Sequence, residues 1–160
     1  MWGDYDNDGL LDFASTVGIY RNTGNGFERL SDSMPHSEHF LFADVNSDGY
    51  LDCVFDGRVL QNTGAGHFVW KDAFTELYET GVAVGDVNND NQVDYYLSGD
   101  NEVFRNIVFY NLPDGFSNDS VTNIFPGYRT GSGSFGDFNN DGWQDLIAMG
   151  IKDEVVNARS

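Results

Sequence analysis

The chain has 160 residues, and its 26 acidic against 8 basic side chains give a formal charge of −18, so a phosphate backbone would be repelled and nucleic acid is not an expected partner. No run approaches the roughly 18 consecutive apolar residues of a membrane-spanning helix, and no charged and then apolar leader is visible. Glycine is abundant at 19 and proline scarce at 3, which favours short strands joined by tight turns. The composition therefore predicts an all-β protein.

A nine-residue acidic segment occurs four times along the chain. It has Asp at positions 1, 5 and 9 and either Asp or Asn at position 3. The copies are residues 4–12, 44–52, 86–94 and 137–145, and their starts lie 40, 42 and 51 residues apart. Such self-similarity is typical of repeat architectures.

Each copy is followed by strand-like sequence in a fixed order. A short apolar run comes first, at 11–14, 51–55, 93–97 and 146–149. An Asn-containing element comes next, at 19–24, 59–64 and 103–106. A third strand is expected at 27–30 and 67–70, and a fourth, at 39–43 and 81–85, leads into the next acidic segment. Four short strands in about 40 residues are the size of a β-propeller blade.

The order of these elements predicts one repeat domain over residues 1–160, with about three full four-stranded blades and part of a fourth. Residues 1–3 are interpreted as a stub of the strand before the first loop, and 154–157 as part of a second strand in the last blade. The third interval is the longest, and its extra residues are expected in 111–128. Because closed propellers have four to eight blades, we expect an open arc or a fragment truncated at both ends.

The acidic segment carries the ligands that calcium prefers. Calcium takes six to eight oxygens from carboxylates, amide carbonyls, backbone carbonyls and water. Side chains at positions 1, 3 and 5 of a tightly curled loop can converge, position 7 can offer its backbone carbonyl, and the Asp at position 9 can close the cage. Gly at position 6 allows the sharp turn, and Asn91 replaces it in the third copy because Asn also visits the left-handed region.

The hypothesis is therefore a calcium site in each loop, with up to four ions in all. The expected ligands of the first two loops are Asp4, Asp6, Asp8, Leu10, Asp12, Asp44, Asn46, Asp48, Tyr50 and Asp52. Those of the last two are Asp86, Asn88, Asp90, Gln92, Asp94, Asp137, Asn139, Asp141, Trp143 and Asp145.

Other metal sites and a metal-free reading were compared with this hypothesis. An EF-hand needs an acidic residue at position 12 and flanking helices, whereas the residues there are Ser15, Phe55, Leu97 and Ala148. Magnesium is a weaker candidate because it demands near-octahedral geometry, and zinc lacks a recognisable His and Cys set, Cys53 being interpreted as a buried apolar residue. The loops could also be Asx-turns without metal, but carboxylates so close together would repel, and four copies favour the metal.

These residues support a family resemblance. The stretch Gly81-Val-Ala-Val-Gly-Asp-Val-Asn-Asn-Asp90 and the element Phe104-Arg-Asn106 resemble the FG-GAP and VCBS repeats of integrin alpha-chain propellers and many bacterial surface proteins. Tyr20-Arg-Asn-Thr-Gly24 looks most like the bacterial-type repeats, including those attached to ASPIC/UnbV domains. The resemblance covers nearly the whole chain and implies a calcium-stabilised propeller of seven or eight blades, extracellular or at the cell surface and often adhesive. The chain departs from it in length and in Asn91.

Three classes of function were compared. The leading hypothesis is a non-enzymatic calcium-binding module with structural calcium and a recognition surface for a protein or glycan. The alternative is a carbohydrate-binding propeller, or an accessory domain of a polysaccharide-degrading enzyme, in which aromatic side chains stack on sugars; Tyr50 and Trp143 at position 7 are instead expected to pack between blades. Catalysis is not expected, because the acids are assigned to metal and no nucleophile with a partner base can be named.

Overall fold

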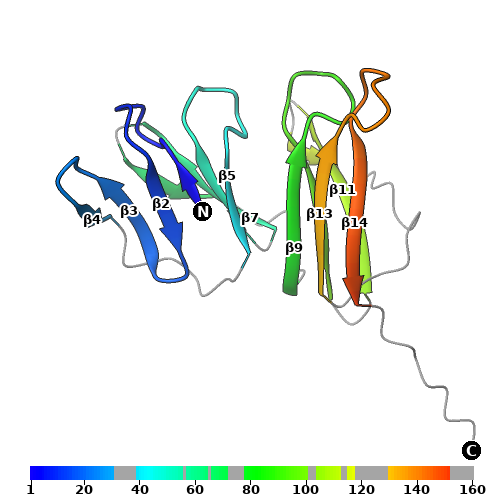
Figure 1. Ribbon diagram of the computed structural model, residues 1–160, viewed down its shortest axis with the longest axis horizontal. Coiled ribbons are helices and arrows are strands. Elements are labelled where there is room, and N and C mark those ends of the chain that lie inside the picture. The colour runs from blue at the N-terminus through cyan, green and yellow to red at the C-terminus, as the bar shows by residue number, and fades with distance from the viewer. Residues whose placement is uncertain are drawn as a thin grey trace, which may run out of the picture.

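All regular structure in the described residues is β. The computed structural model describes residues 1–30, 39–55, 57–64, 66–71, 78–100, 104–112, 115–117 and 130–151. These residues form three four-stranded antiparallel sheets and one two-stranded antiparallel sheet, which follow one another as separate blades (Figure 1). The predicted three full blades and part of a fourth are confirmed, while the expected strand at 154–157 lies outside the described residues.

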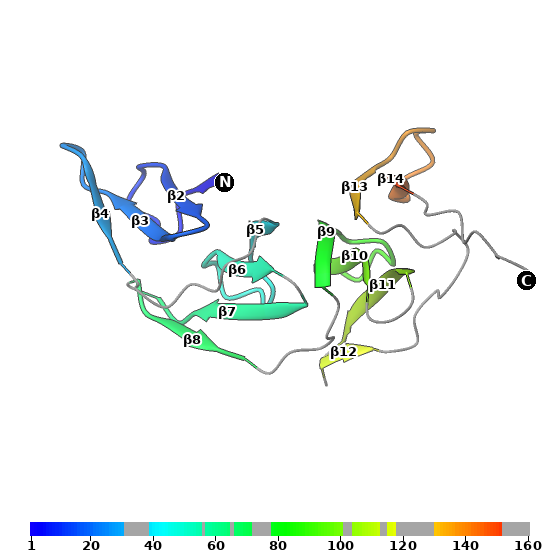
Figure 2. The same cartoon turned by 90° about the horizontal axis from the view of Figure 1, so that it is seen from below.

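The strands of each four-stranded blade lie side by side in chain order. The first blade contains β1 (Trp2–Gly3), β2 (Asp12–Ser15), β3 (Gly18–Asn22) and β4 (Phe27–Arg29). The second contains β5 (Phe40–Ala43), β6 (Asp52–Phe55), β7 (Arg58–Asn62) and β8 (Phe68–Trp70). The third contains β9 (Tyr78–Gly85), β10 (Asp94–Asp100), β11 (Phe104–Leu112) and β12 (Gly115–Ser117), and the last contains β13 (Thr130–Gly136) and β14 (Asp145–Ile151). In the described part of the chain the blades form an open arc (Figure 2).

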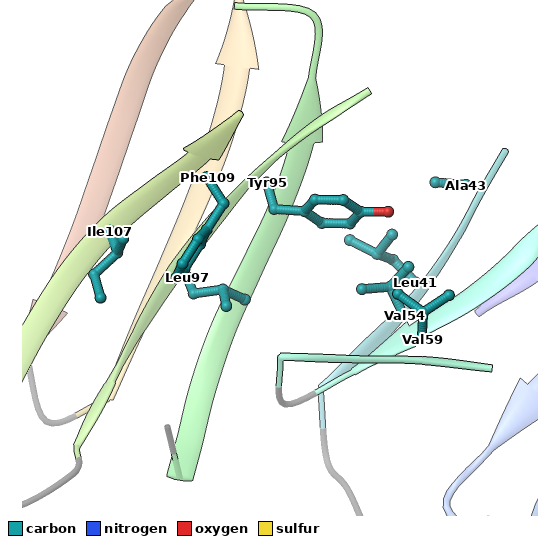
Figure 3. Packing of buried hydrophobic residues seen from close by; sticks show 8 residues of the cluster. All are labelled: Leu41, Ala43, Val54, Val59, Tyr95, Leu97, Ile107 and Phe109. Carbon is teal, nitrogen blue, oxygen red and sulfur yellow. The ribbon is translucent and has the colours of Figure 1, made fainter. Parts of the chain in front are cut away.

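The hydrophobic core lies between the blades. One cluster joins the second and third blades and contains Leu41, Ala43, Val54, Val59, Tyr95, Leu97, Ile107 and Phe109 (Figure 3). The other joins the first and second blades and contains Tyr5, Ala14, Ile19, Cys53, Phe55 and Leu60. Every residue of β6 is buried, as predicted for a strand covered on both faces, and Cys53 is a buried free cysteine. The first three blades are therefore stabilised by apolar contact with their neighbours.

The first three residues form a paired strand and not only a stub. Trp2 pairs with Phe13, and Gly3 pairs with Asp12. The Met1 amino group donates to the carbonyl of Ala14 at 3.0 Å, and the Met1 carbonyl accepts the Ala14 N–H at 2.9 Å. The first acidic loop is thus held on both sides by strand pairing.

The third blade contains a longer central hairpin than the others. β10 and β11 pair over six residue pairs, against three for β2 with β3 and three for β6 with β7. Extra residues of the third interval therefore lie in this hairpin, and their expected placement in 111–128 was wrong to that extent. Within that range, residues 113–114 and 118–128 lie outside the described part of the chain.

Glycines let the third and fourth blades approach closely. A Cβ at Gly81 would overlap the carbonyl oxygen of Gly131, and a Cβ at Gly133 would lie 2.5 Å from a ring carbon of Tyr96. Tyr96 is fully buried, so its ring has no free space to turn into. The glycine-rich sequence of β13 is therefore required by packing.

We expect Gly133→Ala to lower the free energy of unfolding by about 1 to 3 kcal/mol, because the added methyl group overlaps the Tyr96 ring. Urea denaturation followed by circular dichroism measures the change. Gly136→Ala is the control, because its methyl group would meet only the ring of Phe138, which is 54% exposed and can turn away. Equal losses in the two variants would contradict the close-approach argument.

Candidate metal-binding loops

The four acidic loops occupy the same place in their blades. Each connects the first strand to the second: residues 4–12 join β1 to β2, 44–52 join β5 to β6, 86–94 join β9 to β10, and 137–145 join β13 to β14. All four lie at the same end of the blades, the upper end in Figure 1. The repeat in the sequence thus becomes a row of similar loops along one edge of the protein.

The backbone of every loop takes the left-handed conformation twice. At position 6, φ is +87° for Gly9 and Gly49, +88° for Gly142 and +64° for Asn91. The prediction that Asn91 can take the place of glycine is confirmed. Position 4 is also left-handed, at Asn7, Ser47, Asn89 and Asn140. Sequence reasoning missed this second requirement, although the Asn or Ser at position 4 of each copy was its signal.

Two Asp side chains shape each loop through hydrogen bonds to its backbone. The position-1 carboxylate accepts the N–H groups of positions 5 and 6 in all four loops, at 2.8 to 3.1 Å. The position-5 carboxylate accepts the N–H of position 7 at 2.7 to 2.9 Å. The Asx-turn alternative therefore describes part of the real geometry. It does not compete with metal binding, because a carboxylate oxygen that accepts one N–H keeps a second lone pair.

Position 3 divides the loops into two kinds. In the last three loops it is Asn, whose amide oxygen accepts the N–H of position 5 and whose amide nitrogen donates to the position-5 carboxylate. In the first loop it is Asp6, which forms an ion pair with Arg21 at 2.6 Å. The same guanidinium contacts Asp8 at 3.0 Å. In the first loop, therefore, the guanidinium of Arg21 contacts the position-5 carboxylate, which the Asn amide contacts in the other loops.

The first loop contains the only group of three close acids in the described part of the chain. One oxygen each from Asp4, Asp6 and Asp8 lies within 4.8 Å of the others. The Asp6 side chain is only 8% exposed, and its second oxygen, Oδ1, is buried without a hydrogen-bond partner. The side chains at positions 1, 3 and 5 of the first loop therefore converge, as expected from the sequence.

In the first three loops, the Asp at position 9 has a different environment from the acidic residues earlier in the loop. Asp12, Asp52 and Asp94 are fully buried. Each accepts the N–H of loop position 2 with one oxygen, at 3.0 to 3.1 Å, and the N–H of an Asn in the third strand of its blade with the other, at 2.7 to 2.8 Å. Asp12 lies outside the close group of acids. Ligation by the side chains at positions 1, 3, 5 and 9, and by the carbonyl of position 7, stays a prediction.

In the second and third blades, the Asn that bonds to position 9 also links neighbouring blades. The side-chain nitrogen of Asn62 donates to the carbonyl of Tyr5 in the preceding loop at 2.7 Å, and that of Asn111 donates to the carbonyl of Val45 at 2.6 Å. The expected third copy of this element, with Asn106, was wrong: Asn111 takes its place because the longer β10–β11 hairpin moves the Asn from ten to seventeen residues after the Asp. Asn106 instead accepts the Tyr96 hydroxyl.

Neighbouring loops also contact each other directly. The Asn7 amide donates to the carbonyl of Gly49 at 2.9 Å, and the Asn89 amide donates to the carbonyl of Gly142 at 3.3 Å. Between them, the Ser47 hydroxyl bonds to the side-chain oxygen of Gln92 at 3.3 Å. The four loops therefore form a continuous row, each linked to the next through its position 4.

The side chain at position 7 lies beside the turn of its own blade. A Cβ at Gly64, in the Asn-Thr-Gly turn of the second blade, would lie 3.3 Å from the Tyr50 ring. Leu10 occupies the matching place near Gly24 in the first blade. Trp143 is 53% exposed, so the expected packing between blades is not found for this residue.

Comparison with known protein families agrees with this geometry. Residues 86–148, which contain the last two loops, match a family model described as an FG-GAP-like repeat. The comparisons with curated proteins and with solved structures gave no match. The resemblance inferred from the sequence is confirmed for residues 86–148, and the four-stranded antiparallel sheets are consistent with the propeller blades expected of such repeats.

Burial changes the acidity of the inner carboxylates of the repeats. Removal from water raises the pKa of Asp52 to about 6, although the N–H groups of Val45 and Asn62 oppose the change. Burial likewise raises the pKa of Asp12 and of Asp94. An ionised carboxylate at position 9 is therefore unfavourable unless positive charge lies nearby.

We expect the Asp52 carboxyl to titrate with a midpoint near pH 6 in chelator, seen by carbon NMR of the side chain. Because its folded-state pKa lies above its unfolded value, the folded state binds the proton more tightly. The contribution of Asp52 to the free energy of unfolding should fall as pH rises from about 4 to 6. A midpoint near pH 4 would contradict the burial argument.

Removal of the Asn link should reveal its contribution to blade packing. We expect Asn62→Ala to lower the free energy of unfolding by about 1 to 3 kcal/mol, because the buried carbonyl of Tyr5 loses its donor. Asn22→Ala is the matched control, since the Asn22 amide donates to Leu11 within its own blade, at an exposed site. Thermal and urea unfolding compare the two. Equal losses would show that the link between blades adds nothing.

Proposed function

We propose that this protein is a non-enzymatic calcium-binding propeller module, with a calcium ion bound in each acidic loop. The observation that carries the proposal is the first loop, where oxygens of Asp4, Asp6 and Asp8 converge and Asp6 retains a buried oxygen without a partner. A buried polar atom without a partner costs free energy, which a bound cation would remove.

The donor sets fit a hard cation. Each loop offers carboxylate oxygens at positions 1 and 5, a carboxylate or amide oxygen at position 3, and backbone carbonyls. Calcium accepts such all-oxygen sets with variable geometry, whereas zinc prefers nitrogen and sulfur. In the last three loops the Asn amide oxygen points to the N–H of position 5, within the same curl as the two carboxylates. Calcium would neutralise the carboxylates at positions 1 and 5 of these loops.

The charge of the chain supports the same proposal. The four loops hold 13 of the 26 acidic residues, and four calcium ions would change the formal charge from −18 to −10. Repulsion among the carboxylates of one loop would be relieved, and the buried Asp at position 9 would gain a nearby cation. We therefore expect calcium to act as a structural ion that ties each loop to its blade.

We further propose that the module works outside the cell or at its surface, in adhesion or recognition. Calcium-binding modules of extracellular proteins have dissociation constants of about 10⁻⁴ to 10⁻³ M, which suits exposed loops of this kind. The ordered row of loops would then present a fixed surface to a protein or glycan partner.

Carbohydrate binding is the less favoured alternative. Exposed aromatic residues are present, above all Trp2, which is 62% exposed. Trp2, however, packs against Phe13 and Phe27, and Phe13 stacks on Tyr20, so these rings form one cluster on the first sheet. A glycan-array screen at millimolar calcium tests the alternative.

The proposal predicts stabilisation by calcium. At 10 mM calcium, a site with the dissociation constant above should raise the free energy of unfolding by about 1 to 3 kcal/mol, because only the folded loop binds the ion. Differential scanning calorimetry in calcium, in magnesium at the same concentration and in chelator measures the shift in Tm. A Tm that is the same in calcium and in chelator would overturn the proposal.

Substitution of a loop ligand tests whether calcium binds at the acidic loops. Asp90→Ala removes the position-5 ligand of the third loop and should abolish one binding event in isothermal titration calorimetry. Glu28→Gln is the control, because it removes the same charge from an exposed position on β4. Equal calcium binding by the two variants would argue against site-specific ligation.

A further inference from the structure

We infer that Arg21 is a tethered cation that holds the first loop together without metal and competes with calcium for its carboxylates. The inference rests on the proposed calcium-binding function and concerns one loop. Arg21 Nε lies 2.6 Å from an oxygen of Asp6, and its Nη2 lies 3.0 Å from an oxygen of Asp8. These are the ligand positions 3 and 5, so the guanidinium contacts two of the three side chains that would surround a metal ion.

In the repeats, the charge at loop position 3 is matched by the residue that precedes the Asn of the third strand. Arg21 directly precedes Asn22, the residue whose N–H bonds to the position-9 Asp, and Gln61 directly precedes the matching Asn62. In the third blade the residue before Asn111 is Tyr110. Among the three blades whose third strand the structure describes, the loop with a carboxylate at position 3 is thus the one with an arginine at this place, while the loops with Asn46 and Asn88 have neutral residues there.

The shape of the surface allows the arginine to leave. A cleft of about 510 Å³ between the first two blades is lined by residues that include Tyr5, Asp6, Arg21 and Glu28. The Arg21 side chain is 45% exposed, whereas that of Asp6 is 8% exposed. The arginine can therefore swing into the cleft when a divalent ion arrives, while Asp6 stays in place. Arg21 would thus weaken calcium binding in the first loop and preserve the shape of that loop when calcium is scarce.

The test is a calcium titration followed by NMR of backbone amides. Each loop has its own reporter at position 6, because the N–H of that residue donates to the position-1 Asp: Gly9, Gly49, Asn91 and Gly142. In Arg21→Gln, which installs the residue found at the matching place in the second blade, the Gly9 signal should titrate at about three- to tenfold lower calcium than in the wild type. The Gly49 signal should be unchanged. The wild-type Arg21 Nε–H signal should shift as the first loop fills.

Transfer of the charge pair to the second blade keeps the test independent of the folding of Arg21→Gln. Gln61→Arg with Asn46→Asp transfers the charge pair to the second loop and should make Gly49 need more calcium than it does in Asn46→Asp alone. Arg58→Gln is the matched control, because it removes one positive charge from an exposed residue at the other end of β7 from Asn62. It should leave the Gly9 titration unchanged.

The outcomes separate the two proposals. If Gly49, Asn91 and Gly142 respond to calcium while Gly9 titrates equally in wild type and Arg21→Gln, the inference about Arg21 is overturned and the calcium function stands. If no reporter responds in any variant, the calcium function fails and the inference fails with it. A lower midpoint for Gly9 alone in Arg21→Gln, together with the opposite change at Gly49 in the transferred pair, supports the inference.

Discussion

The buried carboxylate at position 9 is the contact on which the first three blades depend. One of its oxygens accepts an N–H from the beginning of the acidic loop, and the other accepts an N–H from the third strand of the same blade. In the second and third blades, the Asn that supplies this second N–H also donates its side-chain amide to the preceding loop, as Asn62 does to Tyr5. One Asp and one Asn thus join a loop, its own blade and the neighbouring blade. Because these groups are buried, loss of any one leaves a polar partner without compensation.

The same arrangement concentrates negative charge at one edge of the protein, and the loops balance it in two ways. Where position 3 is Asn, its amide donates to the position-5 carboxylate, as Asn46 does to Asp48. Where it is Asp6, the guanidinium of Arg21 does so instead. Neither arrangement neutralises the whole set of carboxylates, and the proposed calcium ions would supply the remaining positive charge. The links between loops, such as that from Asn7 to Gly49, then place four such sites in a row.

Much of the local structure could be predicted from residue types and spacing. The acidic loops, the strands after them, the left-handed conformation of Asn91 and the burial of Cys53 all follow from short-range chemistry. The errors occurred where the spacing itself changed. The motif Phe104-Arg-Asn106 looks like the earlier Asn elements, but strand pairing in the long hairpin moves that role to Asn111. A local pattern cannot show how far a hairpin extends, because the pairing of its two strands decides that.

The sequence by itself determined that the chain is a repeat of short strands with four acidic loops, because periodicity and loop chemistry are local properties. Only the tertiary structure decided which residues meet between blades. The Asn62 amide bonds to a carbonyl 57 residues away, and the β13 glycines admit the ring of Tyr96. Tertiary structure also brought Arg21 onto Asp6 and Asp8 across the blade. Such contacts depend on how the strands pair and how the blades pack, and the residue types along the chain do not determine this packing by themselves.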